Sequence, residues 1–133
     1  MKKVIETEVQ VRFADVDVFG HVNNIHQQAY LDLGKTDFYR RVLGLDALAD
    51  NPTLVIVSVR TDFLEQVRRG DVVVVRTWVE RVGTKSVTLG QRIVVRRAEA
   101  EVVCTESESV LVCFDLRAQQ SVEVPDRFRE LLF

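Results

Sequence analysis

The sequence predicts an α+β domain in which a curved antiparallel β-sheet wraps around one long central α-helix. Residues 24–43 have the spacing of a long amphipathic helix. Four segments after residue 52 alternate as strands do, and short turns separate them, which favours antiparallel pairing of neighbours. A single helix must then cover the sheet, so a sheet curved around that helix is the most economical packing.

Length and charge limit the classes of protein to consider. With 133 residues, we expect one domain spanning residues 1–133 with a core of its own. The net charge of -2 gives no overall basic field that would attract nucleic acid or a membrane surface. Charged residues occupy the N-terminus where a signal peptide needs an apolar run, and no apolar segment is long enough to span a bilayer. We therefore expect a cytoplasmic protein.

The first strand and the loop after it bring two carboxylates toward the start of the helix. Residues 4–13 alternate between apolar and polar side chains, which predicts a half-buried strand. Asp15 and Asp17 are two positions apart, so an extended backbone would direct both carboxylates to the same side. Gly20 allows a tight turn, and Asn23 and Asn24 are residues that commonly cap a helix. A carboxylate beside the free N–H groups of a helix N-terminus indicates a hydrolytic site.

The helix predicted over residues 24–43 has two neighbouring apolar rows. One row is Ile25, Ala29 and Leu33, and the other is Leu31, Phe38, Val42 and Leu45. Gly34 inside the helix costs roughly 1 kcal/mol relative to alanine, which indicates a place where the sheet comes very close. Gly44 predicts the C-terminal stop.

The rest of the chain is predicted to form strands over residues 53–64, 72–82, 86–97 and 101–116. Pro125 then precedes a short helix or turn over residues 126–132. In the first of these strands, Val55, Val57 and Val59 are expected on one face. The strand over residues 72–82 is apolar on both faces over most of its length, with Arg76 and Glu80 among the exceptions. One helix cannot bury both faces, so we expect another subunit to cover part of that surface.

The two cysteines, Cys104 and Cys113, are nine positions apart in one predicted strand. A regular strand would place them on opposite faces, which argues against a disulfide or a metal pair. We expect both thiols to be buried packing groups.

Several motifs together resemble one family. An aromatic residue precedes Asp15-Val16-Asp17 and Gly20-His21-Val22-Asn23-Asn24, and Tyr30-Leu31-Asp32 and Lys35 follow in the helix. Downstream come Asp62-Phe63-Leu64, Gly70-Asp71 and Gly83-Thr84-Lys85-Ser86, with Pro125 before the terminal turn. In this order the motifs resemble the hotdog-fold acyl-CoA thioesterases, in the branch that includes the 4-hydroxybenzoyl-CoA thioesterases.

The resemblance implies a site and a reaction. It implies that Asp17 is the catalytic carboxylate and that the backbone N–H near Asn24 polarises the thioester carbonyl. Beside them, His21 is a candidate for orienting the substrate or the loop, with a purely structural histidine as the alternative. Basic residues near the CoA nucleotide are implied as well, and Lys85 is the candidate, with Thr84 and Ser86 as supports for the pantetheine arm or a phosphate. Coenzyme A is part of the substrate, so no cofactor or metal is required.

The resemblance also implies a homo-oligomer, a dimer at least or a tetramer, with the acyl sites at the subunit interface. Neither nucleic acid nor a membrane is expected as a partner. The chain departs from the family pattern at Gln27 and Gln28, where relatives usually carry tyrosine or another bulky residue. Asp32 replaces glutamate and Lys35 replaces arginine, which changes the geometry of any ion pair between them.

Several alternatives stay open at the level of sequence. Asp17 can attack the thioester directly or act as general base on water. Asp15 is expected to be structural, bonded to local N–H groups. A metal site made from both aspartates, His21 and His26 matches no metal-binding spacing. The pairs Arg68-Arg69 and Arg96-Arg97 read as solvated charge or as a site for the CoA phosphates.

The sequence therefore predicts an acyl-CoA thioesterase that hydrolyses a CoA thioester to a free carboxylic acid and CoA. Two alternatives are a thioesterase that acts on acyl-carrier-protein thioesters and a hotdog module that binds acyl-CoA without turnover. An aspartate placed beside the thioester favours an enzyme, because a pure binding module would gain nothing from it.

Overall fold

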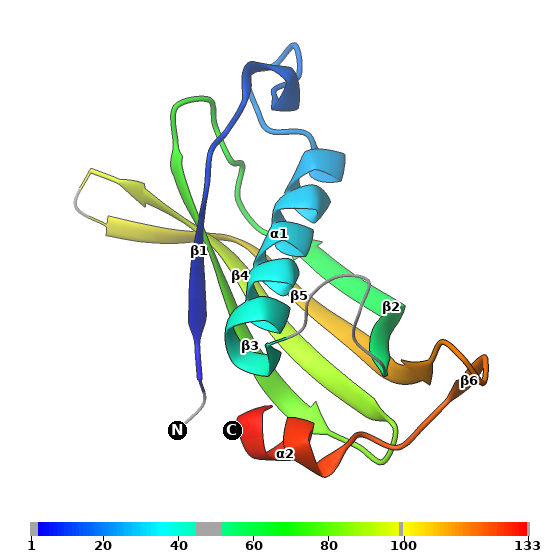
Figure 1. Ribbon diagram of the computed structural model, residues 1–133. Coiled ribbons are helices and arrows are strands. Elements are labelled where there is room, and N and C mark those ends of the chain that lie inside the picture. Colours follow the sequence, from blue (N-terminus) through cyan, green and yellow to red (C-terminus); the bar gives the residue numbers. More distant parts are fainter. Residues whose placement is uncertain (1–2, 45–51, 99, 133) are drawn as a thin grey trace.

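A computed structural model describes residues 3–44, 52–98 and 100–132. It has one antiparallel sheet curved around the helix α1 (Asn24–Leu43), as Figure 1 shows. The strand order is β1-β3-β4-β5-β2, and β6 pairs with β5. The strands are β1 (Ile5–Val9), β2 (Thr53–Phe63), β3 (Val72–Val82), β4 (Ser86–Arg97), β5 (Ala100–Asp115) and β6 (Gln120–Ser121). A 3-10 helix η1 (Phe13–Asp15) follows β1, and α2 (Asp126–Leu132) ends the described chain.

The central helix has the predicted bounds. Asn23 caps its start by accepting a hydrogen bond from the Ile25 N–H, and Gly44 ends it in a left-handed conformation at φ 65°. Of the two predicted apolar rows, the one with Leu31, Phe38 and Val42 is buried against the sheet; Leu45 lies outside the described residues. The other row faces away, because a helix can press only one side against a sheet: Ile25 is 71% exposed and Leu33 is 53% exposed.

Gly34 lies where the helix comes closest to the sheet, as predicted. A Cβ atom at this position would lie only 2.5 Å from Val75 Cγ1 and 3.1 Å from Thr77 Oγ1, both on β3. Ordinary carbon contacts are about 3.5 to 4.0 Å, so only glycine fits without a shift. This contact fixes the height of α1 above the sheet.

Two apolar clusters form the core between α1 and the sheet. One lies at the α2 end and includes Phe38, Leu89 and Phe128; the other lies at the opposite end and includes Leu31 and Ile93. A row of polar side chains crosses the sheet between them, one from each of four neighbouring strands: Thr77, Gln91, Ser107 and Thr61. Gln91 ties this row to the helix, because its Nε2 donates to the Leu31 carbonyl oxygen over 2.9 Å.

Predictions for β1, β5 and β2 were wrong in part, and a local irregularity explains each of them; β1 and β5 come first. The first strand ends at Val9 rather than residue 13, because residues 10–12 leave the sheet and lead into η1, where Phe13 is 84% exposed. A bulge in β5 adds Cys104 to the helix-facing side, so Cys104 and Cys113 are both buried in the core on the same face. Both thiols are free.

A second bulge interrupts β2 between Ile56 and Ser58. Val55 pairs with Val112 and Val59 pairs with Ser109, so the two valines face opposite sides of the sheet. The one-face prediction for β2 was therefore wrong, because the extra residue shifts the alternation. No helix in the described part of the chain is long and apolar enough to cross a membrane.

Candidate active site

Asp15 anchors the loop between β1 and α1. Its carboxylate is fully buried and accepts hydrogen bonds from Tyr30 Oη at 2.6 Å and from the Arg12 guanidinium at 2.9 Å. His26 Nδ1 lies 3.2 Å from the same group. Burial disfavours the charge, but the hydrogen bonds from Arg12 and Tyr30 outweigh it and lower the pKa of Asp15 to about 2. The structure thus confirms the structural role expected for Asp15.

Asp17 lies two residues further on but in a different setting. The backbone turns through η1 instead of staying extended, so Asp15 is buried while Asp17 is exposed. The prediction that both carboxylates share one side was therefore wrong. Asp17 Oδ1 accepts from the N–H groups of Phe19 at 2.9 Å and His21 at 3.3 Å. These bonds hold the carboxylate in a fixed turn that Gly20 closes at φ 81°.

The loop is joined directly to the start of the helix. The Asn23 N–H donates to the Asp15 carbonyl oxygen over 3.0 Å, and the Asn23 side chain accepts from the Ile25 N–H over 2.8 Å. Asn24 is the first helical residue, so its N–H has no acceptor within the helix. The positive end of the helix dipole lies at the same place.

An open cleft of about 500 Å³ brings these groups together. One side comes from the loop and the start of α1, and the other from the end of β2 and the chain that follows it. The cleft is lined by Asp17, Val22, Asn23, Asn24, Gln27, Phe63, Leu64, Glu65 and Gln66. The sequence predicted Asp17 and Asn24 in one site; the structure places both in this cleft.

Sequence reasoning gave no role to Glu65 and Gln66, which come from the opposite wall of the cleft. Their position follows from β2, because Leu64 and Glu65 both donate their backbone N–H to the Cys104 carbonyl oxygen beyond the end of the strand. The Asp62-Phe63-Leu64 motif just before them was the available signal. It marked this segment without indicating that it faces Asp17.

His21 contributes to the site through its backbone. Its N–H donates to the Asp17 carboxylate, and its carbonyl oxygen accepts from the Asp17 N–H over 2.9 Å. An isolated β-bridge between His21 and Arg68 holds the loop against the segment that follows β2. His21 is not one of the residues that line the cleft.

Within one subunit, the cleft is far in space from Thr84, Lys85 and Ser86. They form the turn between β3 and β4, closed by the Gly83 N–H donating to the Ser86 carbonyl oxygen over 2.8 Å. The loop that carries Asp17 follows β1, whose end pairs with the start of β3, so the two sites are separated by the length of β3, roughly 35 Å. Figure 1 shows the β3–β4 turn beside α2, away from the start of α1.

Of the basic pairs in the sequence, Arg68 and Arg69 are the ones beside the loop that carries Asp17. Arg69 donates its N–H to the Gly20 carbonyl oxygen over 3.2 Å, and its guanidinium lies 5.8 Å from the centre of the Phe13 ring. Arg97, in contrast, is paired with Asp71 at 2.9 Å.

The two glutamines at the start of α1 are used differently. Gln27 is buried in the wall of the cleft, and its Oε1 accepts from Thr105 Oγ1. Gln28 Nε2 donates to Thr61 Oγ1 over 2.8 Å. Further along the helix, Asp32 and Lys35 replace the glutamate and arginine of the family pattern. They form a long ion pair, with Lys35 Nζ 3.4 Å from the exposed carboxylate of Asp32.

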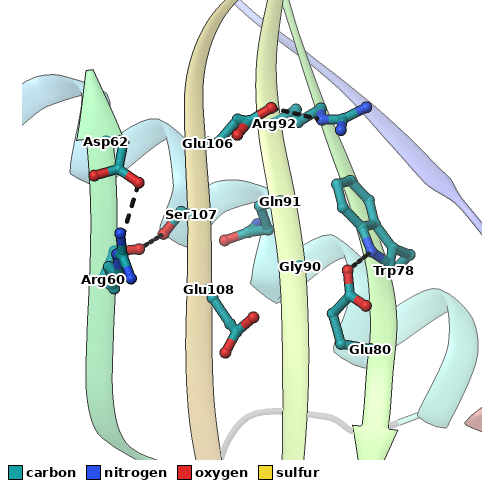
Figure 2. Close-up of a pocket in the computed structure, with 10 residues that line it drawn as sticks. All are labelled: Arg60, Asp62, Trp78, Glu80, Gly90, Gln91, Arg92, Glu106, Ser107 and Glu108. Atoms are coloured by element: carbon teal, nitrogen blue, oxygen red, sulfur yellow. Dashed lines mark hydrogen bonds and ion pairs between the residues drawn. The ribbon is translucent and has the colours of Figure 1, made fainter. Parts of the chain in front are cut away.

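A second hollow of about 270 Å³ lies on the face of the sheet away from α1 (Figure 2). Arg92 lies 3.4 Å from Glu106 and Arg60 lies 3.7 Å from Asp62, while Glu80 accepts a hydrogen bond from Trp78 Nε1 over 2.6 Å. The hollow does not include Asp17. Among the described residues, no three histidine, cysteine or acidic side chains come close enough to hold a metal ion.

A sheet curved around one long central helix is the hotdog architecture, and the carboxylate held in a turn beside the start of that helix lies where the sequence predicts a site. Comparison with known proteins supports this directly. The model of the Thioesterase-like superfamily matches residues 11–132, and the chain belongs to that superfamily.

Individual relatives are consistent with this family. The long-chain acyl-CoA thioesterase FadM of Escherichia coli K12 is 24% identical over 129 residues, which cover 96% of each chain. A mutant of 4-hydroxybenzoyl-CoA thioesterase complexed with 4-hydroxybenzoyl-CoA has the same hotdog fold, with a TM-score of 0.88, 17% identity and coverage of 98% and 99%. A thioesterase of Thermus thermophilus complexed with coenzyme A and zinc is 25% identical, with a TM-score of 0.82 and coverage of 96% and 90%.

Proposed function

We propose that this protein is an acyl-CoA thioesterase that hydrolyses a CoA thioester to a carboxylic acid and CoA. One observation carries the proposal: Asp17 and the start of α1 at Asn24 line the same open cleft. Membership of the thioesterase superfamily and the likeness to FadM support the substrate class.

The reaction needs a nucleophile, a site for negative charge and room for the thiolate to leave. In one route the Asp17 carboxylate attacks the carbonyl carbon, the C–S bond breaks to release the CoA thiolate, and water hydrolyses the resulting anhydride. In the other, Asp17 takes a proton from a water molecule that attacks the same carbon, and the tetrahedral intermediate then breaks its C–S bond and releases the CoA thiolate. In both routes the Asn24 N–H and the helix dipole stabilise the oxyanion; one such donor contributes roughly 100- to 1,000-fold in rate.

Glu65 is the competing carboxylate, because it lines the same cleft. The hydrogen bonds of the two carboxylates favour Asp17. Two backbone N–H groups fix the Asp17 carboxylate, whereas the Glu65 carboxylate accepts no hydrogen bond within the described residues. A fixed group needs less reorganisation to reach the transition state.

Thiol release across a panel of acyl-CoA esters tests the proposal. Asp17→Asn keeps the shape of the side chain and removes its charge. We expect it to lower kcat/KM by at least about 100-fold, while the matched variant Glu65→Gln changes it by less than about fivefold. The reverse order would assign the chemistry to Glu65, and an unchanged rate in both variants would remove the cleft from catalysis.

His21 is proposed as a positioning residue, since its backbone holds Asp17 in place. A variant such as His21→Ala retains the backbone N–H, so kcat is expected to change little. A loss as large as that of Asp17→Asn would give the imidazole a direct role.

The CoA nucleotide is proposed to bind Arg68 and Arg69, the basic pair beside the loop that carries Asp17. Replacing both by alanine is expected to raise KM for CoA esters and leave kcat unchanged, because uniform binding is lost. A thioester without the nucleotide should show no change. The same two substrates measured with Lys85→Ala test the site that the family resemblance implies.

The protein is proposed to form a homodimer through β2. This strand lies at an edge of the sheet, is 11 residues long and exposes Val55, Ile56, Val57 and Val59. A long apolar edge of this kind favours pairing with another strand, and a second copy supplies one by twofold symmetry. The cleft lies at the end of this strand, so a dimer would complete its outer wall.

A further inference from the structure

The side chain of Gln27 faces the cleft with unused hydrogen-bond donors. Gln27 is only 3% exposed and lines the cleft together with Asp17 and Asn24. Thr105 Oγ1 holds its Oε1, which directs the amide nitrogen away from β5. Within the described part of the chain, no acceptor binds that nitrogen. The cleft therefore contains a donor in a fixed position.

The position of this donor relative to the reaction centre follows from the helix. Asn24 and Gln27 are three residues apart, so they share a face and are separated by about 4.5 Å along the axis. The proposed function places the thioester carbonyl oxygen at the Asn24 N–H. An acyl group that enters the cleft from there passes the Gln27 amide within its first few carbon atoms.

A saturated acyl chain would leave this donor without a partner once the substrate excludes water. A buried donor without an acceptor is unfavourable, and a site with such a group discriminates strongly against ligands that cannot pair with it. An oxygen atom on a carbon near the thioester would accept the hydrogen bond instead.

We propose that Gln27 selects acyl groups that carry an oxygen close to the thioester, with 3-hydroxyacyl-CoA esters as the class that fits the spacing. This inference rests on the proposed function, because it uses the carbonyl position at Asn24. The 3-hydroxyl oxygen accepts a hydrogen bond from Gln27 Nε2. Thr105 is the positioning residue, since it orients the amide.

The test compares butyryl-CoA with 3-hydroxybutyryl-CoA, which differ by one oxygen atom. We expect kcat/KM to favour the hydroxy ester by at least about tenfold in the native protein. In Gln27→Leu, which removes the donor and keeps the size, the ratio should fall to near one. Thr105→Val should lower the ratio less, since the amide stays but loses its orientation.

Gln28→Leu is the matched control, because it changes a neighbouring glutamine whose Nε2 already donates to Thr61. It should keep the native ratio. A native ratio near one, or a ratio that survives in Gln27→Leu, would overturn the proposal.

Binding separates this inference from the proposed function. The Kd values of both esters, measured by calorimetry on Asp17→Asn and on the double variant Asp17→Asn/Gln27→Leu, in which turnover does not obscure binding, should show the same preference and the same loss. If neither ester is hydrolysed but the preference appears in binding, the thioesterase proposal fails and the role of Gln27 stands. If binding shows no preference that depends on Gln27, the role of Gln27 is wrong even when turnover is observed.

Discussion

Replacing Tyr30 by phenylalanine removes one contact that holds the loop carrying Asp17. Tyr30 Oη donates to the Asp15 carboxylate over 2.6 Å, and both residues are buried. Tyr30→Phe keeps the ring and leaves the ionised carboxylate with one donor fewer. A hydrogen bond to a charged group contributes about 1.5 to 3 kcal/mol, so the free energy of unfolding should fall by about 2 kcal/mol. For 133 residues this corresponds to a decrease in Tm of roughly 6 to 10 °C.

Denaturant unfolding followed by circular dichroism at pH 7 measures the change, with both proteins at the same concentration. Tyr39→Phe is the matched control, because the Tyr39 hydroxyl has no hydrogen-bond partner among the described residues. We expect that control to lose less than about 0.5 kcal/mol. Equal losses in the two variants would refute the anchoring role of the Tyr30–Asp15 bond.

The difference between native protein and Tyr30→Phe also depends on pH. The folded-state pKa of Asp15, about 2, lies below the value of about 3.9 in an unfolded chain. Its charge therefore stabilises the fold above pH of about 4, and this contribution is lost as the pH falls toward 2. Removing the Tyr30 donor raises the folded-state pKa of Asp15. The difference in the free energy of unfolding between the native protein and Tyr30→Phe should therefore be largest above a pH of about 4 and shrink below it. A difference that grows in acid would contradict this assignment.

Three further substitutions test the packing and the assembly. Gly34→Ala should destabilise the protein by about 1 kcal/mol or more, because crowding against Val75 outweighs the gain in helix propensity. Thermal unfolding measures this loss of stability, and a more stable variant would contradict the close approach of the helix to the sheet. Gly90→Ala places a Cβ 2.6 Å from the ring of the single tryptophan, so tryptophan emission should shift and stability should fall by about 1 to 3 kcal/mol. Val57→Lys, at a valine that is 59% exposed, should dissociate the proposed dimer in analytical ultracentrifugation, while Val4→Lys, at a valine that is 49% exposed, should not; a monomeric native protein would refute the dimer.

The sequence predicted the architecture because its strongest signals are long and periodic. The helix has a cap residue at Asn23, a stop at Gly44 and apolar spacing in between, and all three agree with the structure. Gly34 was informative because it is an unfavourable residue inside an otherwise clear helical pattern. A glycine inside a helix lowers its stability, and the structure shows the steric contact that requires it.

The errors arose where one residue changes the geometry of its neighbours. Cys104 and Val57 each sit at a bulge, and an extra residue in one strand cannot be seen in the alternation of a single sequence. The short helix η1 buries Asp15 and leaves Asp17 exposed, and a single helical turn of this kind is not visible in an alternating pattern either. The far wall of the cleft, with Glu65, depends on strand pairing between β2 and β5, which is not local in the sequence.

We propose that Asp17 performs the chemistry in a cleft that binds acyl-CoA. The most direct measurement compares turnover of one acyl-CoA ester by the native protein and by Asp17→Asn, together with the binding of CoA, which neither protein hydrolyses. We predict that kcat falls by at least about 100-fold while the Kd of CoA stays within about threefold. A variant that binds the ester and hydrolyses it at the native rate would contradict this claim.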